Sequence, residues 1–123
     1  MMLRGMEISR GLLVREPWIS LILSGEKIWE MRSRRTRIKG NIALIRQGSG
    51  HICATANLLG SLEKIEKDQF EKKWFYHRIP HDQTSRCVER GWLFPWVLSD
   101  VVMSYVLIPY NHKRGAVTWV DLT

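Results

Sequence analysis

The fold of this chain is decided by residues 17–32, which read PWISLILSGEKIWEMR. Pro17 suits the first position of a helix, because its missing N–H would have no partner there. Trp18 and Ile22 are four residues apart and therefore lie on the same side of that helix. Gly25 can adopt the left-handed conformation that ends a helix. We therefore predict a short helix that begins at Pro17, ends at Gly25 and is followed directly by a β-strand.

Three ionisable side chains follow the predicted helix within six residues: Lys27, Glu30 and Arg32. Side chains alternate along a strand, so Glu30 and Arg32 share one face while Trp29 and Met31 point to the other. Lys27 lies in the turn before the strand and can reach the same place. Two interpretations are open from the residues alone: a polar site of two cations around one carboxylate, or a structural Glu–Arg pair with Lys27 in solvent.

The spacing of these residues resembles that of a known family. Residues 18–32 read W-x-S-L-x-L-x-G-x-K-x-x-E-x-R, which is similar to the signature of the ASCH family, a group of small β-barrels in the PUA-like superfamily. The segments 96–98, 108–110 and 115–119 also resemble that family, so the likeness extends over nearly the whole chain. The resemblance implies one α+β domain over residues 1–123, a small PUA-like β-barrel with two or three peripheral helices.

The remaining segments agree with an α+β fold. The strands expected at 40–45 and 51–58 are joined at Gly48-Ser49-Gly50, which is a strong hairpin signal. A helical region is expected over 64–76 and a further helical turn over 84–89. The other strands are expected at 11–14, at 96–108 with a bend at Ser99-Asp100, and at 116–122.

Basic residues outnumber acidic ones in this chain. It contains 19 Lys and Arg against 12 Asp and Glu, a formal net charge of +7, and 45% of its residues are hydrophobic. For a globular domain of this size such a charge indicates a polyanionic partner, although it can also serve solubility alone. Four cations directly after the predicted strand are spaced to follow a nucleic-acid backbone: Arg34, Arg35, Arg37 and Lys39.

Four further residues are candidate ligand contacts. Trp18 at the helix start and Trp96, near the cleft that the resemblance implies, could stack on a nucleobase. Arg46 precedes the predicted hairpin turn and Ser49 lies within it. The backbone N–H groups of this turn could hold a phosphate. The alternative for that segment is a plain hairpin turn.

We expect no metal and no cofactor. His77 and His81 are four residues apart, but Pro80 interrupts the helix that would align them as ligands. Cys53 and Cys87 are the only cysteines, so neither a disulfide framework nor a disulfide-linked partner is expected. Without an export signal or a membrane-spanning apolar stretch, the expected location is the cytoplasm, with no membrane partner.

These features predict a domain that binds RNA or a nucleotide-like ligand in a cationic cleft around Trp18, Lys27, Glu30 and Arg32. Two alternatives remain. The first is a hydrolase acting on RNA or a modified nucleoside, with Lys27 as base and Glu30 as acid or as a carboxylate that faces a metal. The second is a protein-interaction module, as in the ASCH domains attached to transcriptional cointegrators.

The resemblance also bears on one particular reaction. Relatives that resemble acetylcytidine amidohydrolases use the motif lysine to activate a threonine three residues further on. Glu30 holds that position in this chain. A carboxylate does not form the same acyl intermediate readily and would favour the charged form of Lys27. We therefore expect little or no deacetylation of acetylcytidine.

Overall fold

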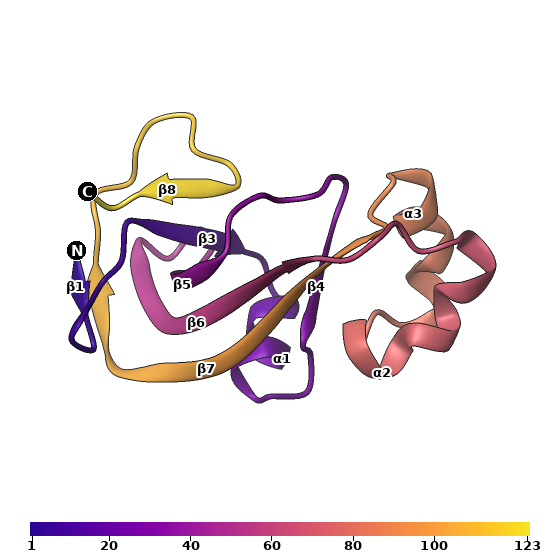
Figure 1. Cartoon of the computed structure of the whole chain (residues 1–123), viewed down its shortest axis with the longest axis horizontal. Helices are drawn as coiled ribbons and strands as arrows, with labels where there is room; N and C mark the ends of the chain where they lie inside the picture. Colours follow the sequence, from indigo (N-terminus) through magenta and orange to yellow (C-terminus); the bar gives the residue numbers. More distant parts are fainter.

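In the computed structural model, which describes residues 1–123, one curled six-stranded sheet forms most of the molecule (Figure 1). The elements in chain order are β1 (Met2–Leu3), β2 (Met6–Glu7), β3 (Arg10–Val14), α1 (Trp18–Leu23), β4 (Trp29–Arg32), β5 (Gly40–Arg46), β6 (His51–Ser61), α2 (Trp74–His77), α3 (Thr84–Glu89), β7 (Phe94–Pro109) and β8 (Trp119–Asp121). Three 3-10 helices accompany α2 and α3: η1 (Lys67–Gln69), η2 (Glu71–Lys73) and η3 (His81–Gln83).

The strand order of the sheet is β4-β7-β6-β5-β3-β8. Only the β3–β5 pair is parallel, and every other neighbouring pair is antiparallel. The long strands β6 and β7 bend together, so that the sheet curls into a half-barrel whose open edges are β4 and β8 (Figure 1). The three short α-helices complete an α+β fold, which confirms the small barrel-like fold predicted from the sequence.

Side-chain alternation divides the core into two clusters on the two faces of the central strands. In β5, Ile42 and Leu44 join the cluster that packs against Ile19 and Ile22 of α1. The residues that alternate with them along β5 pack with the N-terminal strands and β8 instead. This is the period of two that a strand buried on both faces requires.

A third cluster attaches the helical segment to the sheet edge. Met31 of β4 packs against Phe70, Ile79, Cys87 and other buried residues from the segment between β6 and β7. Figure 1 shows that this segment, which carries α2 and α3, lies beside β4 at one end of the molecule. The position of β4 therefore depends on both the sheet and the helices.

The turns occur close to where the sequence predicts them. Gly25 has φ +87° and ends the α1 segment, although the helix itself begins at Trp18 and not at Pro17. The β5–β6 hairpin turns at Gly48 and Gly50, both with positive φ. Asp100 has φ +51° at the bend of β7, where the register with β6 shifts.

The region 64–76 differs from the single helix expected there, since it consists of 3-10 turns before the short α2. In a continuous α-helix the Phe70 carbonyl would accept the N–H of the residue four positions on. Here it accepts from the N–H of Lys73 at 3.1 Å and from the ring of His77 at 2.7 Å instead. The side chain of His77 therefore competes with the helical ladder.

The expected strand 116–122 is shorter as well. It is paired only over Trp119–Asp121, because β8 has its partners at Arg10–Leu12 of β3. None of the helices is long and apolar enough to cross a membrane. Both cysteines, Cys53 and Cys87, are buried and free.

Candidate functional site

A cavity of about 310 Å³ opens beside α1, where residues of β3, β4 and the helical segment meet. Its twelve lining residues are Leu13, Arg15, Trp18, Lys27, Glu30, Met31, Arg32, Gln47, Ile79, Arg90, Trp92 and Val117. Four of them are cations and only one is a carboxylate. The structure thus brings Trp18, Lys27, Glu30 and Arg32 into one cavity, together with residues that the sequence did not single out.

Lys27 forms the innermost part of the site. Its side chain is 1% exposed, so it is neither in solvent nor free to swing over the turn. Its Nζ donates a hydrogen bond to the carbonyl of His77 at 2.6 Å and lies 3.7 Å from Oε1 of Glu30. Burial lowers the pKa of Lys27 to about 8, while the charge of Glu30 acts in the opposite direction. At neutral pH Lys27 therefore remains a cation, but one that loses its proton more easily than an exposed lysine.

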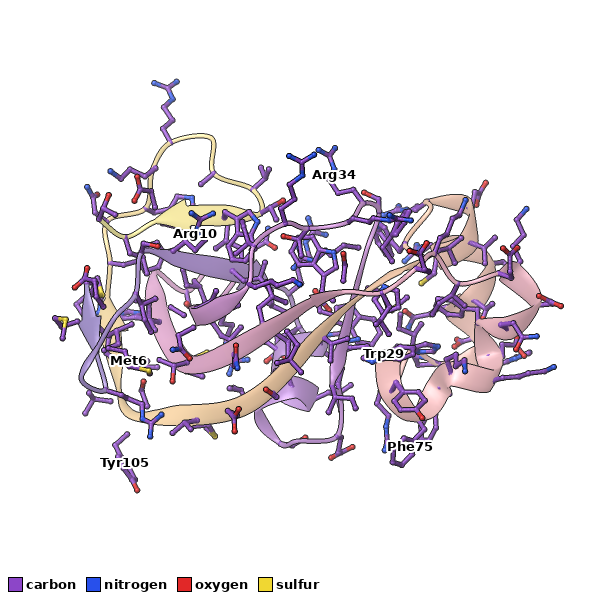
Figure 2. All side chains as sticks on the ribbon, viewed as in Figure 1. Met6, Arg10, Trp29, Arg34, Phe75 and Tyr105 are labelled. Atoms are coloured by element: carbon purple, nitrogen blue, oxygen red, sulfur yellow. The ribbon has the colours of Figure 1, made fainter.

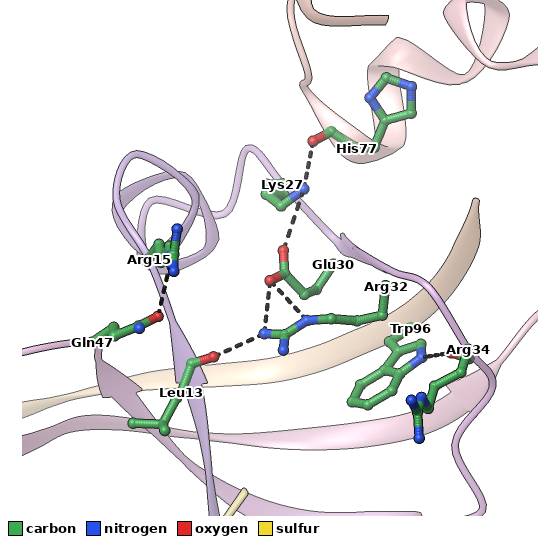
Figure 3. Close-up of polar contacts among 9 residues, drawn as sticks. All are labelled: Leu13, Arg15, Lys27, Glu30, Arg32, Arg34, Gln47, His77 and Trp96. Atoms are coloured by element: carbon green, nitrogen blue, oxygen red, sulfur yellow. Dashed lines mark hydrogen bonds and ion pairs between the residues drawn. The ribbon is translucent and has the colours of Figure 1, made fainter. Parts of the chain in front are cut away.

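Two hydrogen bonds connect Arg32 to Glu30 on β4, an edge strand of the sheet (Figure 3). Nε and Nη2 of Arg32 donate to Oε2 of Glu30 at 3.2 and 2.9 Å. Nη2 of Arg32 also donates to the carbonyl of Leu13 in β3 at 2.8 Å. Since β4 and β3 are not neighbours in the sheet, this guanidinium connects two strands that share no backbone ladder.

His77 supports the site from the helical segment and was considered in the sequence only as a metal ligand. Its side chain is buried, and its Nε2 lies 2.7 Å from the carbonyl of Phe70. Its Nδ1 accepts the backbone N–H of Ile79 at 2.9 Å. A carbonyl can only accept, so the proton is on Nε2 and the ring is neutral, in agreement with a pKa that burial lowers. The ring thus fixes the backbone whose carbonyl binds Lys27.

Exposed polar groups form the outer part of the cavity. Nε of Arg15 donates to Oε1 of Gln47 at 3.2 Å, and the guanidinium of Arg90 lies 5.1 Å from the ring centre of Trp92. The sequence did not reveal these four residues as candidates. They come from separate connections, and no local motif joins them, so only the fold shows that they face one cavity.

The structure does not support a stacking role for Trp96. This residue is 2% exposed and stacks on Trp119, with ring centres 5.8 Å apart. Its Nε1–H donates to the carbonyl of Arg34 at 2.8 Å. Trp96 is therefore a core residue that does not line the cavity, and both its ring and its polar atom already have partners inside the protein.

Arg46 and Ser49 also lie outside the cavity. Arg46 forms an ion pair with Glu16. The hydroxyl of Ser49 bonds to the backbone of His51 across the hairpin turn. The Ser49 side chain therefore stabilises the hairpin turn, and the Arg46 side chain connects the hairpin to Glu16, between β3 and α1. Both contacts agree with the plain-turn alternative. Gln47, between them in sequence, is the residue of this turn that reaches the cavity.

The four predicted backbone-binding cations, Arg34, Arg35, Arg37 and Lys39, are all exposed on the connection between β4 and β5. Figure 2 shows the side chain of Arg34 extending from that connection into solvent. Arg35 forms an ion pair with Glu63 at 2.6 Å. We call these four residues the basic connection.

The cavity combines a surplus of cations with two indole rings, from Trp18 and Trp92. Such a set can hold an anion by charge-assisted hydrogen bonds and a planar ring by stacking. No group of three or more His, Cys, Asp or Glu side chains is arranged to hold a metal ion. Lys27 is the innermost cation of the cavity, and burial lowers its pKa to about 8.

Comparison with known proteins gives one consistent match. The family model of the ASCH domain matches residues 12–101. The structure is similar to ASCH from Zymomonas mobilis, with a TM-score of 0.72 at 13% identity over 93% of this chain and 87% of that chain. Two single-residue variants of that protein give TM-scores of 0.73 at 13% identity, over 95% and 91% of the two chains, and 0.68 at 15%, over 93% and 87%. No curated protein matches this chain.

The buried ion pairs yield a prediction about stability. Replacing Glu30 by Gln leaves Lys27 and Arg32 without their counter-charge, so the free energy of unfolding should fall by about 3 kcal/mol. Glu63→Gln is the matched control, because Glu63 pairs with Arg35 at 85% exposure and should contribute at most about 1 kcal/mol. Urea unfolding of both variants measures the difference. Equal losses would show that the Glu30 cluster is no more important than a surface pair.

Proposed function

The chain belongs to the ASCH domain family, and on that basis we propose that it binds RNA, with one nucleotide in the cavity beside α1. The observation that carries the proposal is the composition of this cavity, four cations and two indole rings around a single carboxylate. A cavity of about 310 Å³ is within the range of small-ligand sites, which is about 300–1,000 Å³.

The phosphate of the nucleotide would be bound at the outer cations. Arg15 and Arg90 are exposed, and most of their N–H groups have no partner in the protein. Nη1 of Arg32 is likewise free, since its other two nitrogens hold Glu30 and Leu13. Free guanidinium donors of this kind suit the oxygens of a phosphate.

The base would lie against the indole rings. Trp18 is half-buried and has Nζ of Lys27 5.0 Å from its ring centre, and the guanidinium of Arg90 lies near the ring of Trp92. Aromatic faces bind nucleobases by stacking, and carboxylates accept from exocyclic amines. Oε1 of Glu30, at 3.7 Å from Lys27, is the oxygen with capacity left for such an amine.

The RNA on one side of the bound nucleotide would follow the basic connection. Its four cations are exposed, and they directly follow Arg32, which lines the cavity. Adjacent cations are what a polyanion requires. Arg35 already forms an ion pair with Glu63, so it would contribute less to phosphate binding than the other three. Arg34, Arg37 and Lys39 are therefore the stronger phosphate-binding residues of this set.

The cavity cations can be tested one at a time. We expect Arg15→Gln and Arg90→Gln each to weaken binding of a labelled eight-nucleotide RNA about tenfold, because a hydrogen bond to a charged group contributes about 1.5–3 kcal/mol. Arg4→Gln is the control, since Arg4 is exposed in the β1–β2 turn and does not line the cavity. Fluorescence anisotropy measures the affinities. Equal effects of all three substitutions would contradict a specific role for the cavity.

The basic connection can be tested through its dependence on salt. Replacing Arg34, Arg35 and Arg37 together by Gln should lower RNA affinity. It should also flatten the plot of log affinity against log salt concentration, by about one unit for each phosphate that the variant no longer neutralises. A triple Gln variant of Arg4, Lys113 and Arg114 removes the same charge from exposed positions elsewhere. The proposal fails for this segment if the two variants have the same slope.

Hydrolysis of RNA or of a modified nucleoside is the second candidate, and one observation favours it. Lys27 is buried in the cavity with its pKa lowered to about 8, which suits a general base better than an ordinary lysine. Glu30 would then be the acid beside it. Against catalysis, Nζ already donates to the carbonyl of His77, and Glu30 opposes loss of its proton.

Turnover distinguishes the two candidates. A lysine base must be neutral, so a rate that depends on Lys27 should rise with pH through about 8. We expect little or no deacetylation of acetylcytidine by the wild type between about pH 6 and 9. Deacetylation that rises through this range and is abolished in Lys27→Met, with the fold of the variant checked by circular dichroism, would make the protein an enzyme.

A further inference from the structure

Three consecutive aromatic residues are exposed on α2. Trp74, Phe75 and Tyr76 have exposed fractions of 47%, 63% and 36%. Figure 2 shows the ring of Phe75 standing away from the ribbon, below that of Trp29. Large exposed apolar side chains that are grouped together generally mark an interaction surface. We call Trp74, Phe75, Tyr76 and Arg78 the aromatic surface.

The aromatic surface is held in a fixed arrangement. Arg78 has φ +59°, which is uncommon for a residue other than glycine. In this conformation its Nε donates to the carbonyl of Phe75 at 2.9 Å, and its guanidinium carbon lies 4.4 Å from the ring centre of Trp74 and 5.1 Å from that of Phe75. Tyr76 stacks on Trp29 with ring centres 4.4 Å apart. The entropy cost of binding would be small, because these rings are already ordered.

The charges around the surface favour a polyanion as its occupant. Lys72 and Lys73 precede the rings, and Arg78 follows them. Residues 71–78 contain one carboxylate, that of Glu71. It lies 2.8 Å from Nδ1 of His81. Rings combined with cations are the elements that bind single-stranded nucleic acid without sequence preference, because every base has a face on which to stack.

The aromatic surface and the cavity share one backbone segment. The carbonyl of Tyr76 accepts the N–H of Ile28 at 3.1 Å, and the next carbonyl, that of His77, accepts a hydrogen bond from Nζ of Lys27. Ile79 lines the cavity itself. The aromatic surface is therefore connected to the cavity through residues 76–79 of one backbone segment.

We propose that the aromatic surface is a second contact for RNA, at which bases next to the nucleotide in the cavity stack on Trp74, Phe75 and the guanidinium of Arg78. This inference rests on the proposed function, since it assumes that RNA occupies the cavity. It extends that function, because it makes the ligand a single-stranded segment of several nucleotides and not a mononucleotide or a duplex, whose bases are already stacked.

The experiment compares a short and a long probe. Uridine 5′-monophosphate reaches only the cavity, whereas a single-stranded oligouridylate of eight nucleotides reaches both. Trp74→Ala should weaken binding of the eight-nucleotide RNA about fivefold or more and leave the affinity for the mononucleotide unchanged. Tyr105→Ala is the control, because Tyr105 is a fully exposed aromatic residue on β7, far from α2 in Figure 2.

Each other outcome is decisive. If Trp74→Ala leaves the eight-nucleotide affinity unchanged while Arg15→Gln lowers it, the inference is wrong and the proposed function stands. If the wild type binds neither probe, the proposed function fails and the inference with it. If sedimentation shows that the wild type self-associates and Trp74→Ala does not, the aromatic surface is a protein interface, which also overturns the inference.

Discussion

The structure depends on one buried carboxylate, that of Glu30, which balances two cations fixed to other parts of the fold. Lys27 donates to the carbonyl of His77 in the helical segment, and Arg32 donates to the carbonyl of Leu13 in β3. Both cations also form ion pairs with Glu30. The cluster therefore joins β4, the helical segment and β3 through side chains, and β4 and β3 share no backbone ladder. Because a buried charge without a partner is costly, both cations require Glu30.

This constraint separates two layers of the cavity. The inner layer, formed by Lys27, Glu30 and Arg32, stabilises the fold. Most of its charged groups already have partners inside the protein before a ligand binds. The outer layer, in which Arg15, Arg90, Gln47 and Trp92 have free groups, is available for recognition. Lys27 belongs to the inner layer, where burial lowers its pKa and the charge of Glu30 limits that decrease. A cation kept in place by its neighbours suits binding better than proton transfer.

The sequence predicts the parts of this structure that are local. The short helix before Gly25, the left-handed conformation of Gly25 and the β5–β6 hairpin follow from spacing and turn residues. The curled sheet follows from the family resemblance. What it could not predict depends on tertiary contacts. His77 interrupts the helical ladder because its ring reaches the carbonyl of Phe70, and Trp96 is removed from the cleft by Trp119. The outer layer lies on separate connections and has no shared motif.

The proposed function requires that a nucleotide occupies the cavity between the two layers. The indole N–H signals of the protein in a nitrogen-15 NMR titration with uridine 5′-monophosphate test it most directly, because the six tryptophans sample different places in the fold. We expect saturable shifts for Trp18 and Trp92, which line the cavity, and none for Trp96, whose indole N–H is bound inside the protein. Shifts confined to Trp74, or no saturable shift at all, would contradict it.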